Sequence, residues 1–267
     1  MRVTAYGCQA PAGPVLTRAQ LFLLRELIRR DFRARFTGSV LGVVWAVLQP
    51  ISLVFLYWFV FTFMIPARLP SGGGRYLEFL IAGLLPWLGI NEGIIRSSTA
   101  IVDNASIVKR VPLRSELLVV VPNASALILE MAGLAIFILF LLIRGSGVGS
   151  LWVLPIALLL QFVLQVGIGL IVAGIYVFVR DLAQVLGFLL SLVFYLSPIL
   201  YSGAGRFEYL FAWNPMTPLL GLFRSATLAA PLPSASSFVF LLFTVVIVFA
   251  SGLTFYRGIR TSMADLI

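Results

Sequence analysis

The residues best suited to chemistry lie near the start of the chain, in an arginine-rich stretch from residue 18 to residue 36. When this stretch is wound as an α-helix, one side carries apolar side chains: Leu21, Leu24, Leu27, Ile28 and Phe32. The opposite side carries charged side chains: Arg18, Arg25, Glu26, Arg29, Arg30 and Arg33. Asp31 and Arg35 interrupt the apolar side, and Phe22 interrupts the charged side. The pattern predicts an amphipathic helix in a membrane interface, with its arginines among lipid head groups; the alternative is a solvated helix that precedes a membrane span.

The composition places the chain in a membrane. Hydrophobic residues make up 61% of the 267 residues and charged residues only 11%, a balance that a water-soluble domain could not expose without aggregating. Residues 36–67 contain no charge and are long enough to cross a bilayer with some tilt. The apolar stretches are about 20 residues or longer and do not alternate with polar residues, which predicts helices rather than barrel strands. The expected fold is an all-α integral membrane protein.

Six transmembrane helices are expected within residues 37–267, after a loose tail at residues 1–17 and the amphipathic helix at 18–36. They occupy roughly residues 40–65, 77–95, 117–143, 151–179, 182–201 and 237–256. Between the last two, residues 202–233 are apolar but interrupted by prolines, so that neither half could cross a bilayer. This segment predicts a re-entrant or interfacial hairpin that enters and leaves the membrane on one side.

The charge distribution predicts the orientation. Six spans put both termini on the same side, and fourteen of the nineteen lysines and arginines lie in segments on that side. The positive-inside rule therefore places both termini in the cytoplasm. The polar segment 96–116, between the second and third spans, is then cytoplasmic, and the hairpin lies on the outer side.

Several kinds of chemistry lack the residues that they need. The sequence contains no histidine, one cysteine (Cys8) and ten acidic residues, so a Cys/His zinc site is excluded and a lipid-modifying enzyme has few candidate acids or bases. An ion-coupled carrier would usually show inverted repeats and several intramembrane charges, and neither is evident. Glu130, near the middle of a span, is either a functional carboxyl or a hydrogen-bonding group between the third and fourth spans. The sequence has no Gly-x-x-x-x-Gly-Lys-Ser/Thr phosphate loop, so energy would come from a partner or an ion gradient.

Motifs along most of the chain resemble those of one family. They are RRDFRARFTGSVLGVVWAVLQP, LIAGLLPWLGINEGIIRSSTAIVDNASIVKRVPLRSELL, VFVRDLAQVLGFLLSLVFYLSPILYS, WNPMTPLLGLFR and the terminal MADLI. Together they resemble the permease subunits of ABC transporters that export cell-surface polysaccharides such as O-antigen, teichoic acid and capsule. The chain departs from the family at residues 111–114, which read Val-Pro-Leu-Arg where members often have Phe-Pro-Arg, and in its preference for arginine over lysine.

The resemblance implies a half-transporter that is not itself an enzyme. Two copies of the chain, joined to two separate ATP-binding subunits that hold ATP and Mg²⁺, would form a channel for a lipid-linked polysaccharide in the bacterial inner membrane. This chain would then have no catalytic, cofactor or metal site of its own. The nearest alternative is an ABC permease for a drug or a small lipid.

The resemblance also implies two sets of residues that meet the ATP-binding subunit. A coupling helix that sits in a cleft of that subunit matches Asp103, Asn104, Ala105, Ser106, Ile107, Val108, Lys109 and Arg110. A short helix with small central residues and charged ends can nest in such a groove, and the alternative is an ordinary polar loop. Arg180 and Asp181 form a tight turn that either contacts the same subunit or anchors the topology.

Two further sets would handle the cargo. If the cargo is carried on a lipid diphosphate, its phosphates lie at the depth of four arginines that can bind them bidentately: Arg29, Arg30, Arg33 and Arg35. The alternative for these arginines is attraction to anionic lipid. Aromatic rings on the first and fifth spans would line the channel and stack on sugars: Tyr57, Trp58, Phe188, Phe194 and Tyr195. The alternative for the rings is packing against lipid or other helices, and the proline-rich hairpin would form the outer gate.

Overall fold

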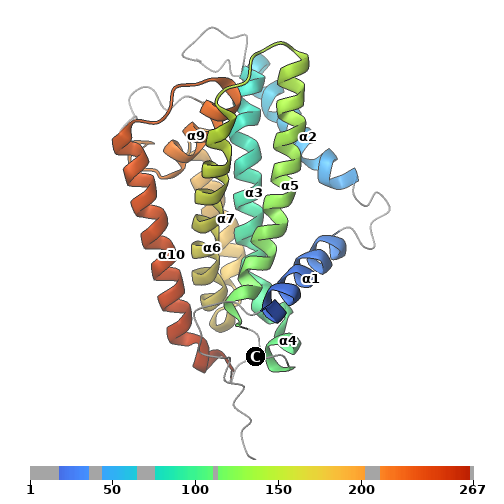
Figure 1. The fold of residues 1–267 in the computed structure, drawn as a ribbon, viewed down its shortest axis with the longest axis vertical. Helices are drawn as coiled ribbons and strands as arrows, with labels where there is room; N and C mark the ends of the chain where they lie inside the picture. The colour runs from blue at the N-terminus through green and yellow to red at the C-terminus, as the bar shows by residue number, and fades with distance from the viewer. Residues whose placement is uncertain (1–17, 36–43, 65–75, 111–113, 202–210, 265–267) are drawn as a thin grey trace, which may run out of the picture.

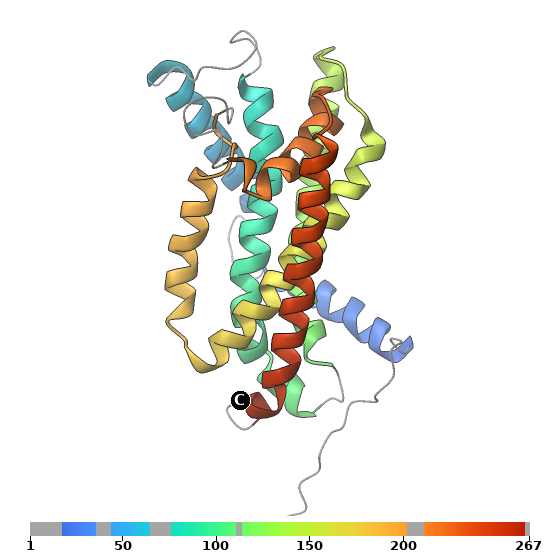
Figure 2. The ribbon, with the colours of Figure 1, turned by 90° about the vertical axis from the view of Figure 1, so that its left-hand side faces the viewer.

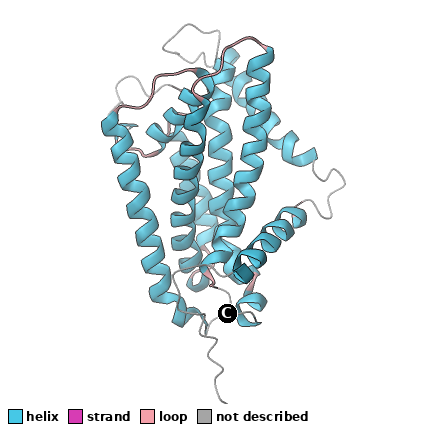
Figure 3. Ribbon diagram, viewed as in Figure 1, coloured by secondary structure: helices cyan, strands magenta, loops and turns pink. Residues whose placement is uncertain are grey.

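The computed structural model describes residues 18–35, 44–64, 76–110, 114–201 and 211–264. Within these ranges every regular element is a helix and no strand occurs, so the all-α prediction is confirmed (Figure 3). The predicted tail at residues 1–17, the connection at 65–75 and residues 202–210 of the predicted hairpin lie outside the described ranges.

Helices of very different length make up the fold. In chain order they are α1 (Arg18–Ala34), α2 (Val44–Phe59) with a π-helical turn (Val60–Met64), α3 (Tyr76–Asp103), α4 (Ala105–Arg110), α5 (Glu116–Ile143), a 3₁₀ turn (Leu151–Val153), α6 (Leu154–Phe178), α7 (Leu182–Tyr195), α9 (Met216–Leu228) and α10 (Ala235–Ala264). Among the described residues, four helical segments are long and apolar enough to cross a membrane: Tyr76–Asp103, Glu116–Ile143, Leu151–Phe178 and Ala235–Arg260. The remaining two predicted spans correspond to shorter apolar helices, Leu48–Met64 and Leu182–Tyr195.

The predicted fifth span is longer than the helix that forms. The sequence predicts a helix over residues 182–201, but α7 ends at Tyr195. Pro198 explains the early end, because it has no N–H to bond a preceding carbonyl and it disfavours helical geometry in the residue before it. The chain then turns through residues 196–201 and does not continue along the helix axis.

The predicted second span, in contrast, is shorter than its helix. The sequence predicts its end at residue 95, yet α3 runs on to Asp103. The hydroxyls of Ser97 and Ser98 donate to the carbonyls of Gly93 and Ile95, each at 2.7 Å, so these polar side chains are satisfied within the helix. The first part of the predicted polar segment is therefore helical, and α4 follows after a break at Asn104.

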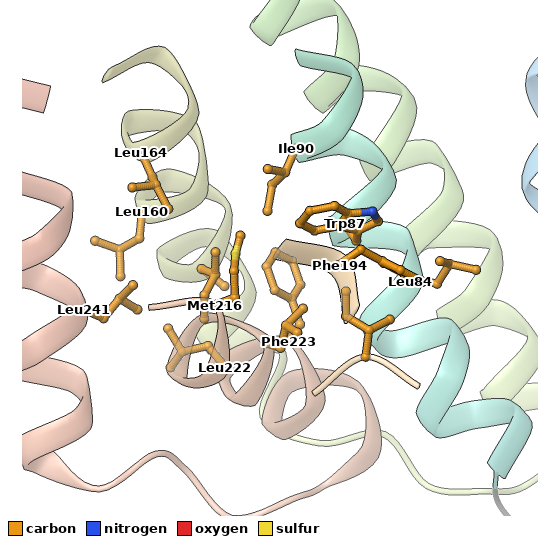
Figure 4. Packing of buried hydrophobic residues seen from close by; sticks show 14 of the residues in the cluster. Leu84, Trp87, Ile90, Leu160, Leu164, Phe194, Met216, Leu222, Phe223 and Leu241 are labelled. Atoms are coloured by element: carbon orange, nitrogen blue, oxygen red, sulfur yellow. The ribbon is translucent and has the colours of Figure 1, made fainter. Parts of the chain in front are cut away.

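Helix α3 lies at the centre of the bundle, where it packs against α5, α6 and α9 (Figures 1 and 2). The main core cluster joins α3 to α2, α5, α6, α7, α9 and α10 through buried side chains such as Trp87, Phe194 and Phe223 (Figure 4). Helices α5 and α10, in contrast, keep large apolar side chains exposed, among them Ile136 and Phe243. Exposed apolar rows of this length are what a helix facing lipid presents.

Helices α6 and α10 approach each other closely at two glycines. A Cβ built on Gly167 would lie 2.8 Å from Cα of Phe249, and one built on Gly252 would overlap the carbonyl oxygen of Gly167. The obstacles are backbone atoms, so no side chain can rotate away.

We expect Gly252→Val to force α6 and α10 apart and to destabilise the protein by about 1–3 kcal/mol. Thermal unfolding in detergent measures the loss. Gly258→Val is the matched control, because a Cβ at Gly258 of the same helix meets nothing within 4 Å. An equal loss in both variants would contradict this account of the packing.

The bundle has two distinct ends. Helix α4, the turn at residues 180–181 and the C-terminal end of α10 lie at one end (Figures 1 and 2). The connection between α5 and α6 and the nearby helix α9 lie toward the other end (Figures 1 and 2). Two of the residue sets singled out in the sequence, on α4 and in the 180–181 turn, therefore share the same end of the molecule.

Candidate functional site

Helix α1 packs its apolar side against the bundle. Leu27 is buried in a cluster with Leu118 and Val121 of α5. Around this cluster pack four partly buried side chains of α1 and α4: Leu23, Leu24, Ile28 and Ile107. Leu21, which the helical pattern groups with the apolar side, is instead half exposed, as is its neighbour Phe22. Much of the apolar side of α1 is thus covered by protein.

The two charges that interrupt the apolar side of α1 are paired with α3. Arg96 of α3 donates to Asp31 at 2.6 Å, and Arg35 forms an ion pair with Glu92 of α3. Arg96 and Glu92 also lie 3.9 Å apart, so the four side chains form one cluster, here called the α1–α3 charge cluster. Burial, followed by the charge of Arg96, lowers the pKa of Arg35 to about 10, while Asp31 opposes the shift. Arg35 therefore remains charged at neutral pH.

The arginines assigned to phosphate separate into two groups. Arg29, Arg30 and Arg33 line a shallow groove of about 280 Å³ on the outer face of α1, together with Glu26 and Ala34. Arg29 is 60% exposed and lies 4.0 Å from Glu26, an exposed pair that holds it only weakly. Arg35 is the fourth predicted residue, and it faces Glu92 rather than the groove. The structure thus groups three of the four predicted arginines around one open groove.

The residue between α3 and α4, Asn104, contacts α1 directly. The guanidinium of Arg30 donates to Oδ1 of Asn104, and Nδ2 of Asn104 donates to the carbonyl of Ala100 at 2.8 Å. Asn104 therefore connects α1 to the C-terminal end of α3. Asp103 and Ser106 are exposed at this end, and Ala105 is partly exposed. Residues 108–110 continue the helix, and their side chains lie outside the description.

The turn at Arg180 and Asp181 connects α6 to α7 at the same end as α4 (Figure 2). Both side chains are exposed. The backbone N–H of Gln184 donates to the carbonyl of Asp181 at 3.1 Å, which starts α7. The turn is therefore accessible to a partner that covers α4.

A hollow of about 200 Å³ lies among α2, α3 and α7. It is lined by Leu53, Tyr57, Leu84, Trp87, Leu88, Asn91, Ser191, Phe194 and Tyr195. Phe194 contacts the other three aromatic rings of its lining: the ring centroids of Tyr57 and Trp87 each lie 5.6 Å from that of Phe194, and the centroid of Tyr195 lies 5.1 Å from it. An aromatic wall beside two small polar side chains, Asn91 and Ser191, can stack on a sugar ring and hydrogen-bond its hydroxyls.

Three of the five predicted aromatics, Tyr57, Phe194 and Tyr195, line this hollow. The other two do not: Trp58 packs against the main core, and Phe188 is 64% exposed. Sequence reasoning missed Trp87, Asn91 and Ser191. The spacing of Trp87 and Asn91 could have indicated them, because residues four apart lie on the same face of a helix.

Glu130 pairs with the neighbouring helix. It is buried on α5 and accepts a hydrogen bond from Nε2 of Gln161 on α6. Gly89 of α3 leaves room for the carboxyl, because a Cβ at that position would overlap Oε2 of Glu130. Further along α3, Ser97 accepts a hydrogen bond from Nδ2 of Asn123 of α5 at 2.7 Å. Of the two interpretations of Glu130, the interhelical hydrogen bond is the one that the structure contains.

The irregular backbone after α7 is held by side chains. Arg224 of α9 donates to the carbonyl of Pro198 at 2.6 Å and stacks on Phe79 of α3, with Cζ 3.7 Å from the ring centre. Asn214 donates to the carbonyl of Leu196 at 2.9 Å. Tyr76 of α3 donates to the carbonyl of Leu200 at 3.0 Å. Non-helical backbone at membrane depth requires such internal partners, because lipid offers none.

Comparisons with known proteins give a consistent result, although no protein-family profile matches the chain. The O-antigen export system permease protein RfbA of Klebsiella pneumoniae is 25% identical over 257 residues, which cover 92% of this chain and 95% of the relative. The protein of the same name from Myxococcus xanthus is also 25% identical, over 92% and 95% of the two chains. The polysialic acid transport protein KpsM of Escherichia coli is 26% identical over 91% and 96%. The chain is thus similar along most of its length to permeases of polysaccharide export, which confirms the resemblance drawn from its motifs.

Proposed function

We propose that this chain is the transmembrane subunit of an ATP-driven exporter that moves a lipid-linked, O-antigen-like polysaccharide across the bacterial inner membrane. The observation that carries the proposal is the similarity to O-antigen export permeases over 92% of the chain, at 95% of the relatives' length. Similarity over the whole length supports a shared architecture more strongly than a single shared motif would.

The membrane arrangement that we propose has six spans. The four long apolar helices each cross the bilayer, and α2 and α7 are the cores of the remaining two. Helix α1 lies in the cytoplasmic interface, α9 belongs to a re-entrant hairpin at the outer face, and both termini are cytoplasmic. Among the described residues, the exposed arginines of α1, the 180–181 turn and the end of α10 support this orientation by the positive-inside rule.

Energy enters through a separate ATP-binding subunit, which holds ATP and Mg²⁺. Helix α4 is the coupling helix, with Ser106 exposed on it and Asp103 exposed just before it, at the end of α3. Arg180 and Asp181 lie at the same end and extend the contact (Figure 2). The sequence lacks a phosphate loop of its own, so it fits the role of a transport subunit.

Two copies of the chain form the channel. The hollow among α2, α3 and α7 is partly open, and Phe55 of α2 and Phe188 of α7 expose their side chains. A second copy placed against α2 and α7 encloses this aromatic wall. Aromatic rings attract the C–H faces of sugars through many weak contacts, which hold a glycan and still let it slide.

The groove on α1 takes the diphosphate of the lipid carrier. We expect Arg29→Gln with Arg33→Gln to reduce export at least about tenfold, because each charge-assisted bond to phosphate contributes about 1.5–3 kcal/mol. Export of the lipid-linked glycan into sealed vesicles measures the loss. Copurification of the ATP-binding subunit should be unchanged, since neither arginine lies on α4.

Arg18→Gln with Arg25→Gln is the matched control for the groove. It removes the same charge from exposed positions of the same helix, outside the groove. Nearly normal export is expected in this variant if the groove binds phosphate. If both double variants export alike, α1 acts only through general attraction to anionic lipid, and the groove has no specific role.

The proposed function itself is tested with the purified complex. The chain is purified with its ATP-binding subunit, and ATP hydrolysis is measured with lipid-linked glycans, small lipids and drugs. Stimulation by a lipid-linked glycan supports the proposal. Stimulation by a drug or a small lipid alone, with no response to glycans, would contradict it.

A further inference from the structure

Two contacts connect α1 to the elements that receive the movement of the ATP-binding subunit. The first is the hydrogen bond from Arg30 to Asn104, the residue between α3 and α4. The second is the α1–α3 charge cluster of Asp31, Arg35, Glu92 and Arg96. The α1 residues of these contacts, Arg30, Asp31 and Arg35, span more than one turn of the helix, so together the contacts restrain both its position and its rotation.

The α1–α3 charge cluster has the composition and burial of a stable contact between the two helices. Its side chains are only 17–31% exposed, and it contains two carboxylates and two guanidinium groups. A partly buried pair is screened less by salt than a surface pair. Removing one partner leaves a partly buried charge without compensation, which costs more than the loss of a surface pair.

The apolar contacts reinforce the same attachment. Leu27 is buried between α1 and α5, and Ile107 of α4 packs against the same cluster. Helix α1 is therefore attached to α3, α4 and α5 by apolar contacts on one part of its surface and by charges on another. Among the groove arginines, Arg30 takes part in this attachment through its hydrogen bond to Asn104, and Arg29 is exposed.

We propose that α1, α4 and the adjoining part of α3 move as one body, with Asp31, Arg35, Glu92 and Arg96 as the positioning residues that hold them together. Movement of α4 then displaces the arginine groove directly. The inference rests on the proposed function for its purpose, because it gives the ATP-binding subunit control over the groove that receives the lipid carrier. In this proposal Arg35 has a positioning role through its ion pair with Glu92, which accounts for its place in the charge cluster and not in the groove.

The first test measures a distance and needs no glycan. Spin labels are attached at Arg25→Cys on α1 and Ile95→Cys on α3, both at exposed positions, in a Cys8→Ser background of the full complex. We expect the same label-to-label distance with and without ATP. Adding Asp31→Asn and Glu92→Gln should broaden or shift the distance, because two guanidinium groups then lack their counter-charges. A distance that changes with ATP before the carboxylates are removed would overturn the proposal.

The second test is rescue by a covalent link. In the Cys8→Ser background, Asp31→Cys with Arg96→Cys removes the ion pair between these two residues. The amount of glycan exported per ATP hydrolysed should fall at least about tenfold, because ATP hydrolysis is then less well coupled to export. A short bis-maleimide linker between the two cysteines should restore export, because a rigid attachment replaces the ion pair. The same reagent on the Cys8→Ser protein, which has no cysteine, is the control. Failure of the linker to restore export would overturn the proposal.

The two tests separate this inference from the proposed function. If no glycan is exported by any variant, the proposed function fails, yet the spin-label distances still decide whether α1 and α3 move together. If glycan is exported and the charge-cluster variants export normally, the proposed function stands and the one-body inference is wrong.

Discussion

Replacing Arg224 by leucine is expected to destabilise the protein by about 3 kcal/mol or more and to abolish export. The substitution leaves the carbonyl of Pro198 without its donor, which costs roughly 1–3 kcal/mol in a buried site. It also removes the stacking of the guanidinium on Phe79, worth about 0.5–2 kcal/mol. Thermal unfolding in detergent measures the loss of stability, and export into sealed vesicles measures the loss of transport.

The size of this effect follows from where Arg224 lies. It holds the turn after α7 against α3 and α9, and a Cβ at Gly83 of α3 would lie 2.9 Å from its guanidinium. Arg224→Lys should recover part of the stability, since an ammonium keeps the charge but lacks the planar fork. Arg257→Leu is the control, because Arg257 is 58% exposed and Arg260 also pairs with Glu116. Equal destabilisation by Arg224→Leu and Arg257→Leu would refute the structural role.

Substituting the accessible side of α4 is expected to detach the ATP-binding subunit. Asp103→Arg with Ser106→Trp reverses a charge and adds bulk at two exposed positions on and beside a six-residue helix. Because such a small helix offers few contacts, a central clash should weaken binding at least about tenfold. Copurification and ATP-dependent export should both fall, while the chain itself unfolds at its normal temperature.

The control for α4 lies at the opposite end of the bundle. Ser236 is exposed near the start of α10, so Ser236→Trp adds the same bulk away from the proposed contact. This variant should copurify with the ATP-binding subunit normally. If the α4 variant also copurifies normally, the subunit binds elsewhere on the chain.

Hydropathy predicted some helices well. The expected spans at residues 117–143 and 151–179 agree closely with α5, Glu116–Ile143, and with Leu151–Phe178. Both are long, predominantly apolar stretches whose ends are marked by charges or glycines, so local composition is enough. The amphipathic pattern likewise predicted a helix where α1 occurs.

Other features depend on contacts between distant residues and could not be predicted in this way. Helix α10 continues beyond the predicted residue 256, and its Arg257 and Arg260 pair with Glu116 at the start of α5. Asp31 and Arg35 looked like exceptions to an apolar side because their partners lie about 60 residues further along the chain. A helical pattern shows which side a residue occupies, but only the fold shows what it meets there.

The aromatic hollow shows the same limit. Tyr57, Phe194 and Tyr195 were predicted from their spans, but Trp87 and Asn91 belong to α3, which has the lowest hydropathy of the four long apolar helices. Its glycines, its one proline and its polar residues lower the hydropathy of α3. The glycines also leave room for side chains of neighbouring helices. The most central helix of the bundle is therefore the one that hydropathy marks least clearly among the four long apolar helices.

The account depends most on α4 being the cytoplasmic contact for a separate ATP-binding subunit. The direct measurement is labelling of Ser106→Cys, in the Cys8→Ser background, with a membrane-impermeant maleimide. In inverted inner-membrane vesicles, we predict rapid labelling without the ATP-binding subunit and protection when that subunit is bound. Labelling from the outside of intact cells, or labelling in inverted vesicles that the bound subunit does not slow, would contradict the account.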